Sequence, residues 1–188
     1  IEVKASIISD EAKRGALTSI YTDMSRIIGD AICQSQRARL HIESSDSPMF
    51  TDSHGNTIHI ENKIQVFKIS ISFSYAGTII SDLAKLQEFG IMDEMAGFAW
   101  TINIFDLIPF VKLIASESEF IDYLTKRIPM YSDKRLEHVD EMDMLGLYYD
   151  NDLIIDKEMK DSTTVRLNAY KDDIDRYFER GGKKPVKI

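Results

Sequence analysis

Cysteine is nearly absent from this chain of 188 residues, because Cys33 is its only copy and no disulfide can form within it. Disulfides are typical of small proteins in oxidising compartments and are rare in the reducing cytoplasm. We therefore predict a cytoplasmic protein. Cys33 stands in a helical pattern, and we interpret it as a packed thiol, since free cysteine is among the most buried residue types.

Long hydrophobic runs are also missing. The longest apolar stretch, residues 98–114, is interrupted by Asn103, Asp106 and Pro109, whereas a membrane-spanning helix needs roughly 18 consecutive apolar residues. No basic segment followed by an apolar run marks a signal peptide at the start. We predict no membrane contact. The chain begins with Ile1 and opens directly in a strand-like run, so we expect it to be a piece of a longer protein.

Positive charge is in short supply. The 23 Lys and Arg residues are outnumbered by 31 Asp and Glu, which gives a net charge of -8. This balance argues against a chain that binds nucleic acid over its whole surface. It leaves room for a nuclease, because a metal site requires carboxylates and a basic surface can be local.

Strand and helix patterns alternate along the chain, which predicts a mixed α/β domain. The 3.6-residue recurrence of Leu17, Ile20, Met24 and Ile27 predicts a long helix from Ser9 or Asp10 to about residue 42. Residues 43–56 are predicted to form a loop or hairpin tip. The remaining predicted strands are 1–8, 57–74 and 98–104, and the remaining predicted helices are 81–89, 106 onward, 119–128, 136–149 and 166–180, before a basic tail.

Apolar residues dominate the strand predicted at 57–74, with Val66, Ile69, Ile71 and Phe73 nearly continuous in character. Such strands are usually buried on both faces of a sheet. Trp100 lies within the strand predicted at 98–104, and we interpret it as a core residue.

The first candidate site is the triplet Glu2-Val3-Lys4. Side chains at i and i+2 of a strand point to the same face, so Glu2 and Lys4 would share one face and Val3 would face the core. A carboxylate can hold Mg²⁺, and a neighbouring lysine can orient water and offset phosphate charge. The same triplet also fits an edge strand with a solvated ion pair, which would contribute little.

Gln34 is the second candidate, because it falls on the otherwise apolar stripe of the long helix between Ala31 and Ala38. A buried polar group needs a hydrogen-bond partner. Two interpretations stay open: a core glutamine bonded to backbone, or a glutamine that reaches back to Glu2 and Lys4.

Residues 1–5 (Ile-Glu-Val-Lys-Ala), followed by a long helix with residues 34–38 (Gln-Ser-Gln-Arg-Ala), resemble the PD-(D/E)xK superfamily of restriction-endonuclease-like nucleases. Residues 11–16, Asp106, residues 120–127 and residues 140–146 look like a bacterial branch of it. The resemblance covers roughly residues 1–150, and its site motifs lie in the first 40.

The resemblance implies a mixed sheet flanked by helices, with residues 1–104 as the later part of a nuclease core and 105–188 as a helical extension. It implies hydrolysis of DNA with Mg²⁺ or Mn²⁺. Glu2 matches the metal-binding acid, Lys4 the lysine and Gln34 the helix glutamine, while the family's first aspartate has no match in this chain. Candidate contacts to the DNA backbone are Lys13, Arg14 and Arg37.

A second hypothesis is a non-catalytic module whose helical half binds a partner protein or forms a homo-oligomer. The net charge of -8 and the unmatched aspartate favour it. A catalytic Mg²⁺ usually needs more than one oxygen ligand from protein or substrate. The chain alone is therefore expected to be inactive even if the whole protein is a nuclease.

Overall fold

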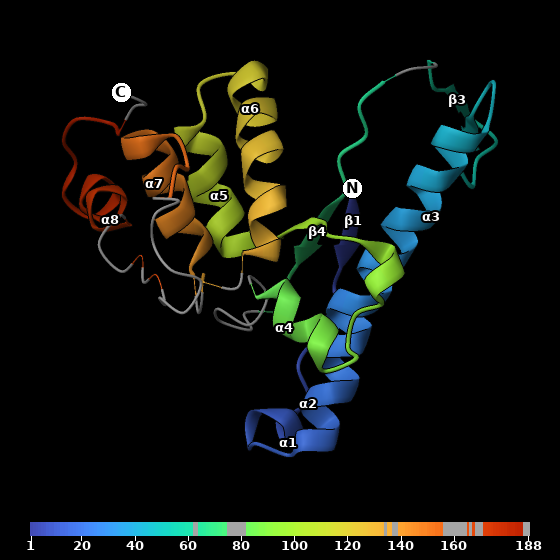
Figure 1. The fold of residues 1–188 in the computed structure, drawn as a ribbon, viewed down its shortest axis with the longest axis horizontal. Helices are drawn as coiled ribbons and strands as arrows, with labels where there is room; N and C mark the ends of the chain where they lie inside the picture. Colours follow the sequence, from blue (N-terminus) through green and yellow to red (C-terminus); the bar gives the residue numbers. More distant parts are fainter. Residues whose placement is uncertain are drawn as a thin grey trace.

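The fold is a small parallel sheet with helices on both faces, seen in a computed structural model (Figure 1). The described strands are β1 (Glu2–Lys4), β2 (Met49–Thr51), β3 (Thr57–His59), β4 (Ile69–Ser72) and β5 (Trp100–Asn103). The described α-helices are α1 (Asp10–Lys13), α2 (Leu17–Met24), α3 (Asp30–Ser44), α4 (Leu83–Glu88), α5 (Ile104–Leu113), α6 (Glu117–Arg127), α7 (Glu141–Asn151) and α8 (Lys171–Arg180). The structure describes residues 1–61, 64–74, 82–133, 135–136, 139–155, 165, 167 and 171–185.

The sheet has the strand order β1-β4-β5, and both pairings are parallel. The α/β class predicted from the sequence is confirmed. Among the described residues this sheet is parallel throughout, whereas a mixed sheet was expected. The antiparallel pair β2–β3 forms a separate hairpin, which agrees with the predicted hairpin tip.

The register of the sheet gives its two faces different chemistry. Val3, Ile71 and Ile102 lie opposite one another, and the alternate residues form a second row on the other face. The polar row consists of Glu2 and Lys4 on β1, Ser70 and Ser72 on β4, and Thr101 and Asn103 on β5. Burial on both faces of β4 is confirmed, but one of the two buried faces is polar.

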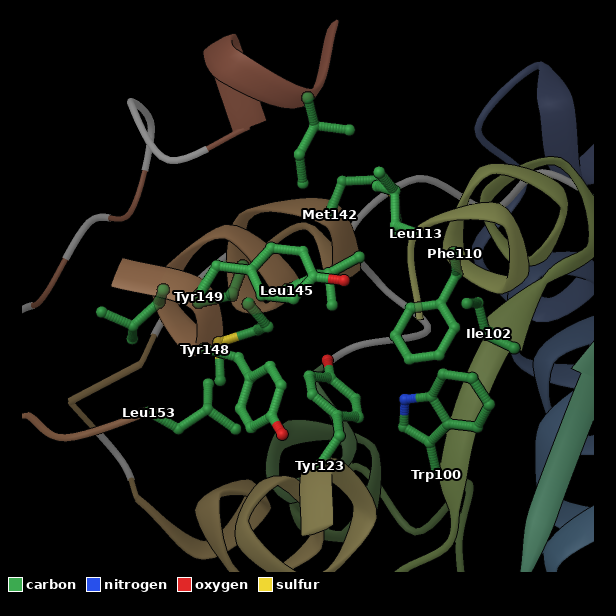
Figure 2. Close-up of a cluster of buried hydrophobic side chains, with 14 of the residues drawn as sticks. Trp100, Ile102, Phe110, Leu113, Tyr123, Met142, Leu145, Tyr148, Tyr149 and Leu153 are labelled. Atoms are coloured by element: carbon green, nitrogen blue, oxygen red, sulfur yellow. The ribbon is translucent and has the colours of Figure 1, made fainter. Parts of the chain in front are cut away.

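The apolar face packs against the helices α5, α6 and α7, which Figure 1 shows together on one side of the sheet. Aromatic rings fill this core (Figure 2): the Trp100 and Phe110 ring centroids lie 4.9 Å apart, and those of Phe110 and Tyr123 lie 5.0 Å apart. Trp100 is buried, as predicted. Aromatic pairs in such tilted and edge-on geometries stabilise a core beyond the area that they bury.

Val3 does not face the core, which corrects the prediction. Its side chain is 50% exposed, while Ile102 on the same face is fully buried. The reason is the place of β1 at the edge of the described sheet. The helices of the apolar face cover β5 and reach β4, and they leave the outer side of β1 open.

The long helix predicted from Ser9 to residue 42 is divided. α1 ends at Lys13, and Gly15 adopts a left-handed φ of 90° that turns the chain before α2 begins. From Leu17 to Ser44 the helix is continuous, but residues 25–29 form a π-helical turn between α2 and α3. Apolar residues of this turn and of α2 pack with α4 in a second core cluster, against which Cys33 is packed.

Other element boundaries follow local capping. α6 begins after Ser116, whose Oγ accepts a hydrogen bond from the Glu119 backbone N–H, slightly before the predicted start at residue 119. α5 begins earlier than predicted, because Asn103 caps it. Residue 81, at which the helix predicted at 81–89 begins, lies outside the described residues. No described helix combines the length and apolar character that a membrane crossing requires.

A closed network of buried polar groups centres on Glu141 in the helical half. Glu141 accepts hydrogen bonds from Arg127, from Trp100 Nε1 at 2.6 Å and from Tyr123 OH at 2.5 Å. Arg127 Nη2 and Glu141 Oε2 are 3.0 Å apart, and both side chains are 2% exposed. Burial and the charge of Glu141 together hold the pKa of Tyr123 well above its usual value. Every charge here has a counterpart, as a buried ion pair requires.

Candidate functional site

Glu2 and Lys4 point to the same face of β1, as the strand period predicts. Lys4 Nζ lies 3.2 Å from Glu2 Oε1, and the two side chains are 17% and 30% exposed respectively. This face lies under α3, which contacts both β1 and β4. The pair is therefore partly covered and partly accessible to solvent.

Gln34 of α3 completes the cluster. The Lys4 ammonium donates a hydrogen bond to Gln34 Oε1 over 2.8 Å, across a separation of 30 residues in sequence. The prediction that Gln34 approaches the strand is confirmed, and the alternative of a glutamine bonded only to backbone is wrong. One strand and one helix thus hold an ammonium group between a carboxylate and an amide oxygen.

The basic residues proposed for DNA contact do not all lie near the cluster of Glu2, Lys4 and Gln34. Lys13 is paired with Asp10 at 3.2 Å and Arg14 with Glu11 at 3.5 Å, both on exposed α1. At 1.5 Å per residue, the start of α2 next to them lies roughly 25 Å along the helix from Gln34. Arg37 is exposed on α3, about one turn beyond Gln34. Only Arg37 therefore lies near the Lys4 cluster.

Lys68 is a buried cation that the sequence prediction missed. Its side chain is 5% exposed. Lys68 immediately precedes β4, and the two-residue period of a strand places it on the same polar face as Ser70 and Ser72. Its Nζ donates a hydrogen bond to the Ala96 carbonyl oxygen. Within the described part of the chain no carboxylate forms an ion pair with it. Burial, and then the charge of Arg39, lower the pKa of Lys68 to about 8.

The polar face also contains oxygen atoms with unused hydrogen-bonding capacity. Ser70 Oγ is buried and has no hydrogen-bond partner within the described residues, and the same holds for Gln36 Oε1 on α3. Buried polar atoms without partners are uncommon in folded proteins. Together with Lys68, they distinguish this face from the closed network around Glu141.

The sequence did contain a signal for this face. Positions 68, 70 and 72 are polar and alternate with Phe67, Ile69 and Ile71, which is the period of a strand with two unlike faces. The apolar half of this pattern was recognised and the polar half was not. Trp100-Thr101-Ile102-Asn103 repeats the same alternation on β5.

Metal ligands are sparse around the cluster. In the stretches of chain that the structure describes, no three His, Cys, Asp or Glu side chains gather into a group that could hold a metal ion. Glu2 is a single carboxylate with solvent access. Mg²⁺ is often bound by one or two carboxylates and keeps several waters for exchange with substrate phosphates. Glu2 therefore fits as one ligand of such an ion, with the others supplied from elsewhere.

Comparisons with known proteins give no relative for this chain: no protein-family model, no curated protein and no solved structure matches it.

Proposed function

We propose that this chain carries the later part of a metal-dependent nuclease that hydrolyses DNA phosphodiester bonds. The observation that supports the proposal is the position of the Lys4 ammonium, 3.2 Å from Glu2 Oε1 and 2.8 Å from Gln34 Oε1. An acid, a lysine and an amide in contact on a strand and its covering helix are three of the groups that the resemblance to restriction-endonuclease-like nucleases implies, the first aspartate of the family being unmatched.

Each of these side chains has a definite task under the proposal. Glu2 would hold Mg²⁺ or Mn²⁺, and the bound ion would supply Lewis acidity and a water of lowered pKa. Lys4 would orient that water and offset the charge of the phosphate. Gln34 would fix the direction of the Lys4 ammonium, because an acceptor on a rigid helix restricts a flexible lysine.

The proposal is tested by cleavage assays on the full-length protein. Plasmid DNA and a labelled duplex oligonucleotide are incubated with Mg²⁺, with Mn²⁺ or with EDTA. We expect cleavage with either metal, none with EDTA, and recovery when metal is added in excess. Absence of cleavage with both metals, or cleavage that EDTA leaves unchanged, would contradict a metal-dependent nuclease.

A second candidate function is a non-catalytic module that binds a partner or a second copy through its helical half. The observation that favours it is the outer surface of α5, where Phe105 is 63%, Ile108 48% and Val111 60% exposed. Adjacent exposed apolar side chains at this spacing often mark an interface. Sedimentation velocity of the parent and of Phe105→Ser tests it: a dimer lost in the variant supports the module, and two monomers exclude self-association.

A further inference from the structure

The end of α8 and the segment after it form an open cavity of about 420 Å³. Gly181 N–H donates to the Tyr177 carbonyl oxygen over 3.1 Å, and Gly181 and Gly182 then adopt φ values of 70° and 132°. These left-handed conformations are easily reached by glycine. They turn residues 183–185 back beside the last turns of α8, so that a segment expected to be a basic tail becomes one wall of a cavity.

Positive charge dominates the lining of this cavity. Arg176, Lys183 and Lys184 contribute three cations, and Asp173 contributes one carboxylate, which is paired with Arg176 at 2.8 Å. The chain as a whole has a net charge of -8. A local surplus of cations in an acidic protein attracts anions to this place rather than to the surface in general.

Main-chain donors add to the side-chain cations. The N–H groups of Gly182, Lys183 and Lys184 donate no hydrogen bond to any described residue. Successive free amides in a turn can bind the oxygen atoms of an anion. Tyr177 lies in the same lining and is half-buried, so that an aromatic ring stands beside the cations.

We propose that this cavity binds a nucleotide phosphate group, with Lys183, Lys184 and the backbone amides of residues 182–184 on the phosphate oxygens and Tyr177 beside the base or sugar. A volume of about 420 Å³ is in the range of small-molecule sites. The phosphate belongs either to a free nucleotide or to one unit of a DNA strand, and the same chemistry recognises both.

The inference stands apart from the proposed nuclease activity. α8 lies at the outer edge of the helical half, with α5, α6 and α7 between it and β1 in Figure 1. Binding at α8 therefore neither requires nor reports on Glu2 and Lys4. Failure of either proposal leaves the other standing.

The test is an NMR titration of ¹⁵N-labelled protein with AMP, with adenosine and with inorganic phosphate. We expect saturable shifts at the Gly181, Gly182, Lys183 and Lys184 amides with AMP, and much weaker shifts with adenosine. The double variant Lys183→Ala/Lys184→Ala should bind AMP about tenfold more weakly, because charge-assisted hydrogen bonds are lost. The matched double variant Arg39→Ala/Lys85→Ala removes the same charge on α3 and α4, away from α8, and should bind AMP as the parent does.

The outcomes decide the proposal. The proposal would be overturned by equal affinity for AMP and adenosine or by the absence of a saturable shift. An equal loss of AMP affinity in the two double variants would also overturn it. Lower thermal stability of Lys183→Ala/Lys184→Ala with unchanged AMP affinity would also overturn it, because the lysines would then only complement the helix end. A fluorescein-labelled DNA decamer identifies the source: weaker decamer binding by the same variant indicates a strand, and weaker AMP binding alone indicates a free nucleotide.

Discussion

Two buried polar regions of this molecule differ in how completely their charges are matched. Around Glu141, Arg127 is fully buried but receives a carboxylate, and Tyr123 and Trp100 occupy the remaining lone pairs. On the polar face of the sheet, Lys68 is also buried but hydrogen-bonds only to a backbone carbonyl among the described residues. Both regions bury a cation, but among the described residues only Arg127 has a carboxylate partner.

The difference separates a region that stabilises the fold, around Glu141, from a region that could act on a ligand, on the polar face of the sheet. The closed network ties α6 and α7 to β5, and within the described residues its carboxylate is fully engaged by Arg127, Trp100 and Tyr123. The open polar face has a cation with no counterion among the described residues and a partly exposed ion pair at Lys4. Perturbed and incompletely paired groups are more frequent at functional sites. Four predictions test whether this division is correct.

The largest effect is expected at the closed network. Glu141→Ala leaves Arg127 buried without a counterion, and we expect the free energy of unfolding to fall by about 3–5 kcal/mol. Urea denaturation followed by circular dichroism measures it. Glu94→Ala, an exposed glutamate, should change it by less than about 0.5 kcal/mol.

If the alanine variant does not fold, Glu141→Gln supplies the measurement, since its amide oxygen still accepts some of the hydrogen bonds. We expect a loss of about 2–3 kcal/mol for it. A loss below about 1 kcal/mol in both variants would show that the network contributes no more than a surface ion pair.

The next effect concerns activity rather than stability. Glu2→Ala in the full-length protein should reduce DNA cleavage at least about 100-fold, because the metal loses a carboxylate. Its unfolding free energy should change by less than about 1 kcal/mol, since a partly exposed ion pair contributes little. Cleavage rates on plasmid DNA and urea denaturation give the two readouts.

Glu11→Ala is the matched control, because Glu11 belongs to another acid-x-Lys triplet but lies exposed on α1. It should cut DNA at the parent rate. Lys4→Ala should cleave far more slowly while Mn²⁺ binding persists. Parent-like cleavage by Glu2→Ala, with the same metal dependence, would remove the nuclease proposal and favour the partner-binding module.

A smaller change in the free energy of unfolding, opposite in sign to that of Glu141→Ala, is expected at Lys68. Lys68→Met should raise the free energy of unfolding by roughly 1–2 kcal/mol at pH 7, since methionine fills similar space without a buried charge. The pKa of Lys68 is about 8 when folded and 10.5 as a free group. Below pH 8 the folded protein therefore carries the full cost of the charge.

Between pH 8 and 10.5 the unfolded chain binds more protons at this residue, so parent stability rises with pH and the advantage of Lys68→Met shrinks. Stability curves of both proteins from pH 7 to 10.5 measure this convergence. Lys112→Met, at an exposed lysine, should show no convergence. A Lys68→Met variant that is less stable than the parent at pH 7 would mean that a counterion reaches Lys68.

The smallest effect is expected at Gln34. Gln34→Leu removes the acceptor of the Lys4 ammonium, and we expect cleavage to fall about 5–10-fold with a stability change within about 1 kcal/mol. Gln36→Leu on the same helix is the control, because its buried Oε1 bonds to nothing within the described residues. Equal cleavage by the two variants would make Gln34 a structural residue only.

Local patterns predicted the site better than they predicted its surroundings. A polar residue on an apolar helical stripe had to find a partner, and Lys4 is that partner at 2.8 Å. The burial of Val3 depended on what covers the sheet edge, which no period within the strand encodes. The predicted strand therefore had the correct face for Lys4 and the wrong environment for Val3.

Tertiary context also explains the other differences. Lys68 is held by the Ala96 carbonyl, 28 residues away in sequence, and no local pattern predicts that contact. The cavity at α8 depends on two consecutive left-handed glycines, which a sequence permits but does not require. Helix starts such as Ser116 were predictable, because the cap and its N–H partner lie three residues apart.

The π-helical turn at residues 25–29 sets the direction in which each side chain of the following helix α3 points. A π turn accommodates one residue more than an α turn, and each residue advances an α-helix by about 100°. Gly29 closes this turn at a point where any side chain would run into the Ile91 carbonyl oxygen. Deleting one residue here would turn Gln34 away from β1 while preserving the helix, so the cluster at Lys4 depends on an irregularity that lies five to nine residues before Gln34 in the same helix.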